Sequence, residues 1–535
     1  MQAFGLSCQG GLNTNLNQFQ MLEQPGFATE LQNFEVDPDG GYRRINGFTS
    51  YGGGSAARPN SSNSILGLFV YGDGVIACSG TNIYFTLDGT SWLQINRSSV
   101  SSSGDNYSTF TGRSTAARTS QGQATFALYE GDSTYGEVVI TDKGSGVKPA
   151  LFKMTGTGAL ADRTFFYEEV TVSGTHYPKF CTIHDKHLVV AGATTALNTI
   201  YYSGTSDINS FSSTGSGSIV LDDQVVGLRS FRGDLIIFCK NSIYKLININ
   251  DSSNIAIVPI TQNVGCLDGH SIQEIGGDLI FLSPDGFRLV AGTARIGDVE
   301  LSSVSRQIQS IVSSIAANIN TYVISSAVLR SKSQYRLFYS SSSGSSTTAK
   351  GLIGTITPRG FEWSETIGIQ AHGFTSGFDN DSVEQVYHGD KDGYVYNHNT
   401  GNDFNPAGSS ANIDARYKTP NLDFGDAGTL KSLHYTKISF TPEGTVQPTL
   451  KITYDFDDTN RPQPPVYTLD SILTPAVFGD STLGTAVFGA SSDPMARQAV
   501  QGSGHNIAFK IYSQDTNAPY SINGFYVDYR PSGRR

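Results

Sequence analysis

Short apolar runs separated by polar turns fill the middle of the chain, and one arrangement of them recurs. The apolar run Gly233 to Phe238 is followed by a turn and by Asn241 to Tyr244. Gly277 to Leu282 is followed in the same way by Asp285 to Leu289, and an earlier copy begins at Asp185. The copies recur every 40 to 50 residues or so, which is typical of the short-stranded blades of a β-propeller.

Looser copies of this unit extend the array in both directions. They begin near Ile65, Ala124, Tyr335 and Val386. A four-stranded blade does not bury both of its faces alone, so blades stack into a ring that also protects their edges. Residues 51–405 are therefore predicted to form a β-propeller of roughly six or seven blades. The uneven spacing of the copies indicates loop insertions between them.

The first 50 residues have a different pattern. Their apolar positions are sparse and lie among turn-forming Pro and Gly residues, so residues 1–50 are predicted to be an N-terminal arm that lies on a surface and ends in a hairpin. The apolar anchors are too many for a free linker, and we expect a neighbouring subunit or an adaptor to bury them. The candidate assembly residues are Leu12, Leu22, Phe27, Leu31, Phe34, Arg43 and Arg44. Removal of residues 1–40 should then leave the propeller folded and prevent assembly.

Residues 406–535 show longer strands with strict alternation of apolar and polar positions. Examples are Thr449 to Tyr454 and Ile507 to Tyr512. Such alternation marks strands with one wet face and predicts a β-sandwich-like C-terminal domain. One helical stripe interrupts the β pattern, from Leu301 to Ile319, with Ser302 or Ser303 as its N-cap. This helix is expected to pack across the ring.

Composition agrees with a turn-rich, all-β protein and limits its partners. The chain has 59 glycines and 11% aromatic residues, but only 16% charged residues. Its net charge of -11 argues against a surface that grips phosphates, because nucleic-acid binding needs clustered Lys and Arg. The five cysteines are widely spread and are expected to be free thiols. No apolar run reaches membrane-spanning length, and no signal peptide is expected.

Few residues suggest chemistry. His184 and His187 are the densest pair of candidate ligands, but on an extended strand they point to opposite faces. The turns at Asp37 and Asp390 begin like calcium loops and lack the closing glutamate. No nucleophile elbow or phosphate-binding loop is present. We therefore expect no cofactor, no metal, no catalytic residue and no enzymatic activity, although a glycosidase with carboxylates on separate blades stays open.

The order of these parts resembles the tail nozzle proteins of short-tailed, podovirus-like bacteriophages. The likeness lies in the Gly10 to Asn13 phrase, the Pro25-Gly26 segment that leads to Asn33, and the turn from Gly41 to Phe48. It continues in the helix after Leu301 and in the terminal strand that ends at Arg535. The resemblance covers most of the chain loosely and rests on the order of the parts.

The resemblance implies a structural virion protein, assembled in the host cytoplasm as a homohexamer at the distal end of a phage tail. It also implies an adaptor ring above, fibres or spikes outside, and a plug or needle at the tip. Double-stranded DNA would pass through without specific binding, and the acidic balance suits such a conduit. The alternatives are a tail-associated carbohydrate-binding protein or depolymerase, and a propeller scaffold for protein partners. Oligomeric state separates them.

Overall fold

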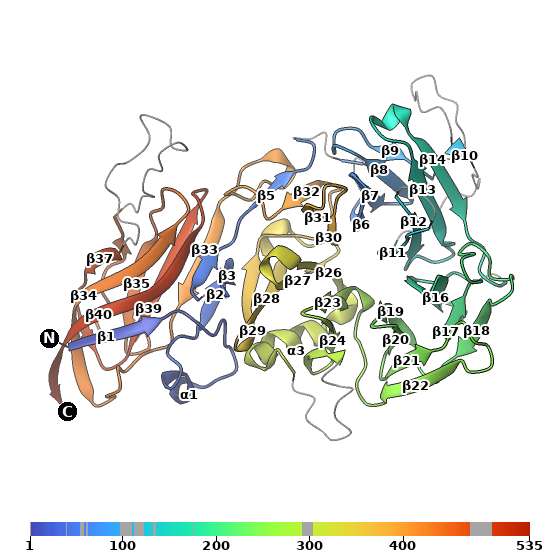
Figure 1. The fold of residues 1–535 in the computed structure, drawn as a ribbon. Coiled ribbons are helices and arrows are strands. Elements are labelled where there is room, and N and C mark those ends of the chain that lie inside the picture. The colour runs from blue at the N-terminus through green and yellow to red at the C-terminus, as the bar shows by residue number, and fades with distance from the viewer. Residues whose placement is uncertain are drawn as a thin grey trace.

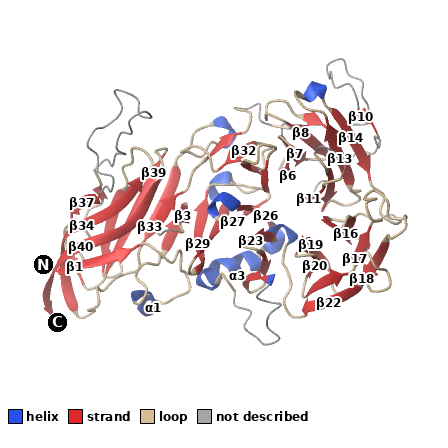
Figure 2. Ribbon diagram, in the orientation of Figure 1, coloured by secondary structure: helices blue, strands red, loops and turns tan. Residues whose placement is uncertain are grey.

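The chain folds into a ring of β-sheets joined to a two-sheet sandwich (Figure 1). A computed structural model describes residues 2–38, 40–53, 58–59, 63–96, 110–111, 122–131, 135–174, 176–290, 303–470 and 495–534. Strands make up most of the regular structure and helices are few (Figure 2). The predicted fold class, an all-β propeller with an added C-terminal sandwich-like domain and an N-terminal arm, is confirmed.

The first four sheets of the ring follow one another along the chain, and consecutive strands pair antiparallel in each, except for Phe110–Thr111 in the second sheet, which pairs parallel with Thr164–Glu169. The first sheet contains β6 (Ile65–Tyr71), β7 (Gly74–Ser79), β8 (Asn82–Thr86) and β9 (Leu93–Gln94). The second contains β10 (Phe110–Thr111), β11 (Ala124–Tyr129), β12 (Glu137–Asp142), β13 (Ala150–Thr155) and β14 (Thr164–Glu169). The third contains β15 (Phe180–His184), β16 (His187–Ala193), β17 (Ala196–Tyr202) and β18 (Gly217–Val220). The fourth contains β19 (Val225–Phe231), β20 (Asp234–Cys239), β21 (Ile243–Ile247) and β22 (Ala256–Thr261).

Three further sheets complete the ring. A three-stranded sheet contains β23 (Gln273–Ile275), β24 (Asp278–Ser283) and β25 (Gly286–Leu289). The next blade contains β26 (Tyr322–Leu329), β27 (Gln334–Ser341), β28 (Lys350–Thr357) and β29 (Gly360–Ile367). The last contains β30 (Gly373–Phe378), β31 (Glu384–Gly389), β32 (Val395–His398) and β5 (Phe48–Ser50). Six sheets thus have at least four strands among the described residues, and the three-stranded sheet fills the remaining place.

The ring closes through the N-terminal part of the chain. Strand β5 pairs antiparallel with β32, with Thr49 opposite Asn397, so a strand that precedes the first blade completes the last one. The inner strands of the last and first blades, β30 and β6, lie in contact. Gly67 and Gly373 face each other there, and a Cβ on Gly373 would come within 3.2 Å of the Gly67 backbone. Glycine allows this close approach of the two inner strands.

Two sheets form the C-terminal sandwich. One contains β1 (Gln2–Ser7), β3 (Phe34–Val36), β4 (Tyr42–Arg44), β34 (Thr429–Pro442), β37 (Met495–Ala499), β38 (Ser503–Gly504) and β40 (Tyr520–Arg534). The other contains β2 (Glu30–Gln32), β33 (Ile413–Lys418), β35 (Thr449–Tyr454), β36 (Tyr467–Thr468) and β39 (Ile507–Asp515). Rings from the two sheets meet in the core, with Phe509 and Phe525 5.7 Å apart.

The arm is part of both domains, which differs from the expected surface segment. Strand β2 pairs with β29 of the propeller on one side and with β33 of the sandwich on the other, which makes one nine-stranded sheet. Strands β1, β3 and β4 belong to the second sandwich sheet, and β5 belongs to the last blade. The arm's short helix α1 (Gln18–Leu22) projects below this seam in the view of Figure 1. The first 50 residues are therefore distributed between the two domains.

The expected amphipathic helix is present in a shorter form. A 3-10 turn (Arg306–Ile308) leads into α3 (Gln309–Ala317), and the turn begins after Ser305. Ile308, Val312 and Ile315 are buried in a core that extends from the three-stranded sheet to the sandwich. Leu301 and Ser302 lie outside the described residues. No helix in the described parts of the chain is long and apolar enough to cross a membrane.

Candidate functional site

A cavity of about 300 Å³ lies where the inner strands of the propeller converge. Its wall includes residues of β6, β11, β19, β23, β26 and β30, so most sheets of the ring contribute to it. Some lining residues are buried, such as Ser325 and Ser326, whereas Ser230, Glu274 and Arg330 are exposed. The cavity therefore runs from the interior of the ring to its surface.

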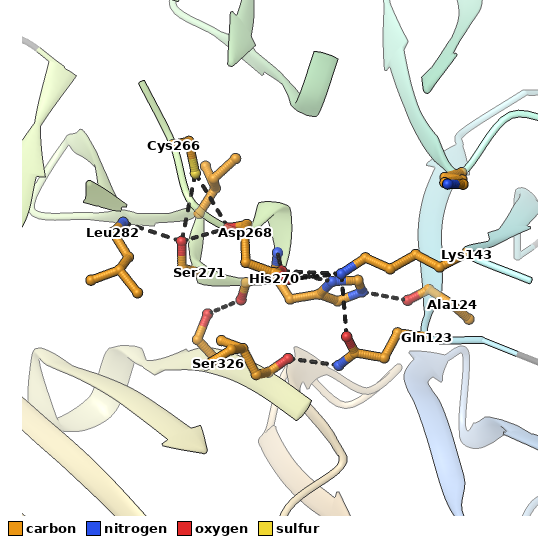
Figure 3. Close-up of polar contacts among 12 residues, drawn as sticks. Gln123, Ala124, Lys143, Cys266, Asp268, His270, Ser271, Leu282 and Ser326 are labelled. Atoms are coloured by element: carbon orange, nitrogen blue, oxygen red, sulfur yellow. Dashed lines mark hydrogen bonds and ion pairs between the residues drawn. The ribbon is translucent and has the colours of Figure 1, made fainter. Parts of the chain in front are cut away.

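A polar cluster adjoins this cavity, and its residue His270 is part of the cavity wall (Figure 3). Lys143 Nζ lies 2.9 Å from Asp268 Oδ2 and 3.3 Å from Gln123 Oε1. His270 Nδ1 lies 3.2 Å from Asp268 Oδ1, and His270 Nε2 lies 3.1 Å from the Ala124 carbonyl oxygen. A 3-10 turn (Gly269–Ser271) holds His270, and the Asp268 carboxylate caps it by accepting from the His270 backbone N–H at 2.8 Å.

Two further hydrogen bonds tie this cluster to the β26 blade. Gln123 Nε2 donates to the Ile324 carbonyl oxygen at 2.6 Å, and Ser326 Oγ donates to the His270 carbonyl oxygen at 2.5 Å. The second blade, the three-stranded sheet and the β26 blade are thereby joined at one point. These contacts hold three sheets of the ring together beside the cavity.

Charge and burial fix the protonation of this cluster. Burial by itself would raise the pKa of Asp268, but the charge of Lys143 and a hydrogen bond from His270 hold that pKa below its usual range. Burial, and then the charge of Lys143, lower the pKa of His270. The ring is therefore neutral near pH 7, and it donates from one nitrogen at a time because both nitrogens face acceptors. The cluster contains one complete ion pair, Lys143 with Asp268.

Arg229 on β19 lines the same cavity and has a different environment. Its Nη2 donates to the Ile272 carbonyl oxygen at 3.2 Å and its Nη1 to the Leu228 carbonyl oxygen at 3.3 Å. The side chain is half-buried, and burial lowers its pKa. A guanidinium stays charged at physiological pH in spite of such a shift. The cavity thus contains a fixed positive charge on its wall.

The predicted assembly residues of the arm divide into two groups. Leu12, Leu31 and Phe34 are 3%, 1% and 0% exposed and lie in the chain's own core. They are not available to a neighbouring subunit, which corrects that part of the prediction. Leu22 and Phe27 are partly exposed. Those two residues remain candidates for contact with another copy.

Arg43 and Arg44 are also used within the chain. Arg43 pairs with Glu35 at 2.7 Å and with Glu443 at 2.5 Å. Arg44 is fully buried and donates to backbone carbonyl oxygens, including that of Asp515 at 2.8 Å. Both arginines therefore stabilise the seam between arm and sandwich, which corrects their assignment to an intersubunit interface.

The sequence did not point to Glu35, which lies where the arm, the sandwich and the propeller meet. Its buried carboxylate accepts from Arg43, from Lys332 at 2.7 Å and from Arg336 at 2.8 Å. Burial by itself would raise the pKa of Glu35, but the three cations outweigh burial and lower the pKa to about 2. The only local signal was a Glu in a sparse arm, because two of its partners lie about 300 residues away in the sequence.

The histidine pair of the sequence analysis has structural partners. His184 Nδ1 lies 2.9 Å from Ser230 Oγ. His187 Nδ1 lies 2.6 Å from the Ser203 carbonyl oxygen, and its Nε2 lies 2.9 Å from Asn250 Oδ1. Among the residues that the structure describes, no group of three or more His, Cys, Asp or Glu side chains is arranged to hold a metal ion. All five cysteines are buried free thiols.

Comparison with known proteins gives little beyond the fold. No family model and no curated protein matches the chain. An exo-beta-1,3-galactanase from Phanerochaete chrysosporium is 8% identical with a TM-score of 0.25, and the match covers 94% of this chain and 99% of that chain. BamB from Moraxella catarrhalis is 14% identical with a TM-score of 0.32, and the match covers 62% of this chain and 92% of that chain.

The expectation from the sequence that this chain is not an enzyme is withdrawn. With TM-scores below 0.5, neither the activity nor the substrate of these proteins is carried over to this chain.

Proposed function

We propose that this chain is a structural subunit of a bacteriophage tail, and that six copies form the nozzle ring at the distal end through which the genome leaves. The observation that carries the proposal is the way in which the first 50 residues join the two domains. Strand β5 closes the propeller, β2 lies between the propeller and the sandwich, and β1, β3 and β4 complete the sandwich. The N-terminal arm that the resemblance implies is, in this chain, the segment that joins the propeller to the sandwich.

This construction suits a ring subunit under load. Two domains on a linker move relative to one another unless a large apolar interface holds them. Here one sheet runs without interruption from β26 to β36, and one hydrophobic core extends from Ile280 in the propeller to Phe525 in the sandwich. The buried Glu35 pairs across the same seam with Arg336. A subunit of this kind transmits force from one domain to the other, as a pressurised conduit requires.

The small volume of the central cavity decides where DNA would pass. The cavity of about 300 Å³ is at the lower limit of small-ligand pockets, and hydrogen bonds of Gln123 and of the His270 carbonyl oxygen join three sheets beside it. A duplex does not fit through one chain. The conduit of a nozzle would therefore be the space enclosed by several copies, and the net charge of -11 per copy would disfavour DNA binding along it.

The proposal includes partners that the resemblance implies. An adaptor ring would bind above, fibres or spikes on the outer face, and a plug or needle at the tip. The chain would be assembled in the host cytoplasm and found in the virion. The alternative is a tail-associated carbohydrate-binding protein or depolymerase.

Oligomeric state tests the proposal. Negative-stain images and sedimentation velocity of the purified full chain should reveal closed sixfold rings, alone or after addition of the adaptor. Trimers would favour the depolymerase, since closed trimers are the expected state of that class. A monomer at all concentrations and with the adaptor present would refute the nozzle.

A further inference from the structure

The guanidinium of Arg229 lines the central cavity without a carboxylate partner. Its contacts are two backbone carbonyl oxygens, those of Leu228 and Ile272. No Asp or Glu in the described ranges forms an ion pair with it, whereas Lys143 in the polar cluster beside the cavity is paired with Asp268. A partly buried charge without a counter-charge costs free energy. The wall therefore offers a site for an anionic group.

Hydrogen-bonding groups surround this charge. The hydroxyls of Thr125 and Thr375 line the cavity and form no hydrogen bond with any other described residue. Ser325 Oγ donates to the Ala371 carbonyl oxygen at 2.6 Å, which leaves its oxygen as an acceptor. The cavity thus combines one half-buried cation with several neutral donors and acceptors, which suits a ligand rich in hydroxyl groups.

Aromatic side chains supply an apolar wall. Phe69 and Phe126 stack with ring centroids 5.3 Å apart, and both line the cavity together with Phe374. Small-molecule sites in proteins are mostly apolar surfaces with a few placed polar groups. The C–H face of a sugar ring packs against such a wall, while its hydroxyls bind the neutral polar groups.

We propose that the central cavity binds one carboxylated sugar residue of the uronic acid type, with its carboxylate on Arg229. The planar guanidinium fork matches a carboxylate in shape and charge. A phosphate, with nearly two negative charges, fits less well because Glu274 lies at the mouth and the other lining arginine, Arg330, is exposed. The cavity volume of about 300 Å³ limits the ligand to about one ring. This site is independent of the proposed nozzle ring.

Titration calorimetry of the full chain with glucuronate, glucose and acetate tests the assignment. Glucuronate should bind at least about tenfold more tightly than glucose, because one charge-assisted bidentate pair is lost with the carboxylate. Acetate should bind more weakly than glucuronate, since it lacks the ring. Equal binding of glucuronate and glucose, or of glucuronate and acetate, would overturn the proposal, and so would no binding of glucuronate.

Variants locate the site. Arg229→Gln should lower glucuronate affinity about tenfold or more and leave glucose affinity unchanged. Arg229→Lys keeps the positive charge but not the planar guanidinium, so it should cause an intermediate loss of glucuronate affinity. This variant replaces Arg229→Gln in the test if the Gln variant does not fold. The matched control is Arg232→Gln, an exposed arginine near the end of the same strand that donates to the Gly277 carbonyl oxygen at 2.6 Å outside the cavity. Full affinity in both Arg229 variants, or equal loss in the control, would refute the site.

Discussion

Glu35 Oε2 accepts a hydrogen bond from Arg336 Nη2 at 2.8 Å, and both side chains are almost fully buried. The two residues come from different parts of the fold, since Glu35 lies on arm strand β3 and Arg336 on propeller strand β27. Lys332 and Arg43 contact the same carboxylate. One carboxylate thus contacts three cations at the junction of the domains, of which Arg336 is buried and the other two are half-buried.

Replacement of this carboxylate should destabilise the protein strongly. Glu35→Gln leaves Lys332 and Arg336 without a counter-charge, whereas Arg43 keeps Glu443. Breaking a buried pair in this way costs roughly 3–5 kcal/mol. Chemical denaturation should therefore show a lower free energy of unfolding by about that amount. The control is Glu365→Gln, whose partner Lys350 is 47% exposed, and it should cost at most about 1 kcal/mol. Equal effects of the two variants would contradict a special role for Glu35.

Acid should destabilise the fold from about the pKa of a free histidine downward. Burial lowers the pKa of His372 to about 4 and that of His388 to about 3. The unfolded chain binds protons at these histidines below about pH 6.5, but the folded chain does not, so stability is lost as the pH falls from about 6.5 towards 4. Glu35, with a folded pKa of about 2, adds a second loss below about pH 4.5.

Calorimetry across this pH range measures the effect. The melting temperature should fall between pH 7 and pH 5. In the variant His372→Gln the slope should be smaller, because one titrating group is gone. A melting temperature that is flat or rises on acidification would show that these histidines are not buried in the neutral form.

The local parts of the fold could be predicted from the sequence, whereas the long-range parts could not. The apolar runs at Leu235 and Leu279 form β20 and β24, because strand and turn signals are local and repeat along the chain. The arm strands β2 and β3 are three residues long and too short to give a periodic signal. Gln32 pairs with Glu365, more than 300 residues away, so nothing near it in the sequence indicates a strand.

The same limit applies to the candidate site. Gln123, Lys143, Asp268 and His270 are isolated polar residues in the sequence, and only closure of the ring brings them together. Arg229 lies within a strand like many others. The sequence did predict sparse apolar anchors in the arm, but their burial in the chain itself depends on β33 and β40, near the other end of the chain.

The arm should be essential for folding, contrary to the expectation that its removal leaves the propeller intact. Phe34 is fully buried and meets Tyr520 edge-on at 5.9 Å, so Phe34→Ala should cost roughly 3–5 kcal/mol. Leu22→Ala, at a partly exposed position, should cost about 1 kcal/mol or less. Urea unfolding of both variants measures the difference. Similar small losses would restore the view of a dispensable arm.

Purified protein should have no appreciable affinity for double-stranded DNA, even at low salt. The net charge of -11 repels phosphates. The side chains of Arg43 and Arg44 bind groups of the chain itself, so they do not form a basic surface for DNA. Fluorescence anisotropy with a labelled duplex measures this, with polylysine as the positive control. Tight binding that weakens steeply with added salt would reveal a basic surface and contradict a sliding conduit.

Phe19 should contribute to contact between copies of the chain. It is 82% exposed on helix α1, the highest value among the exposed large apolar residues of the described chain. This helix is held in place by a capping box between Asn17 and Gln20, and Thr14 donates its backbone N–H to the Gln307 carbonyl oxygen at 2.8 Å. An exposed aromatic ring on an ordered helix indicates an interaction site more strongly than an exposed ring on a loop does.

Phe19→Ser should therefore reduce ring formation without loss of fold. Sedimentation velocity should show a shift from rings towards monomers, because burial of such a side chain contributes roughly 1.5–3 kcal/mol at each interface. The melting temperature of the monomer should not change. The matched control is Phe456→Ser, 58% exposed in a turn of the sandwich, which should leave the rings intact. Rings that persist in the Phe19 variant would show that α1 is not part of the interface. A wild-type chain that forms no rings even with the adaptor present would refute the nozzle itself.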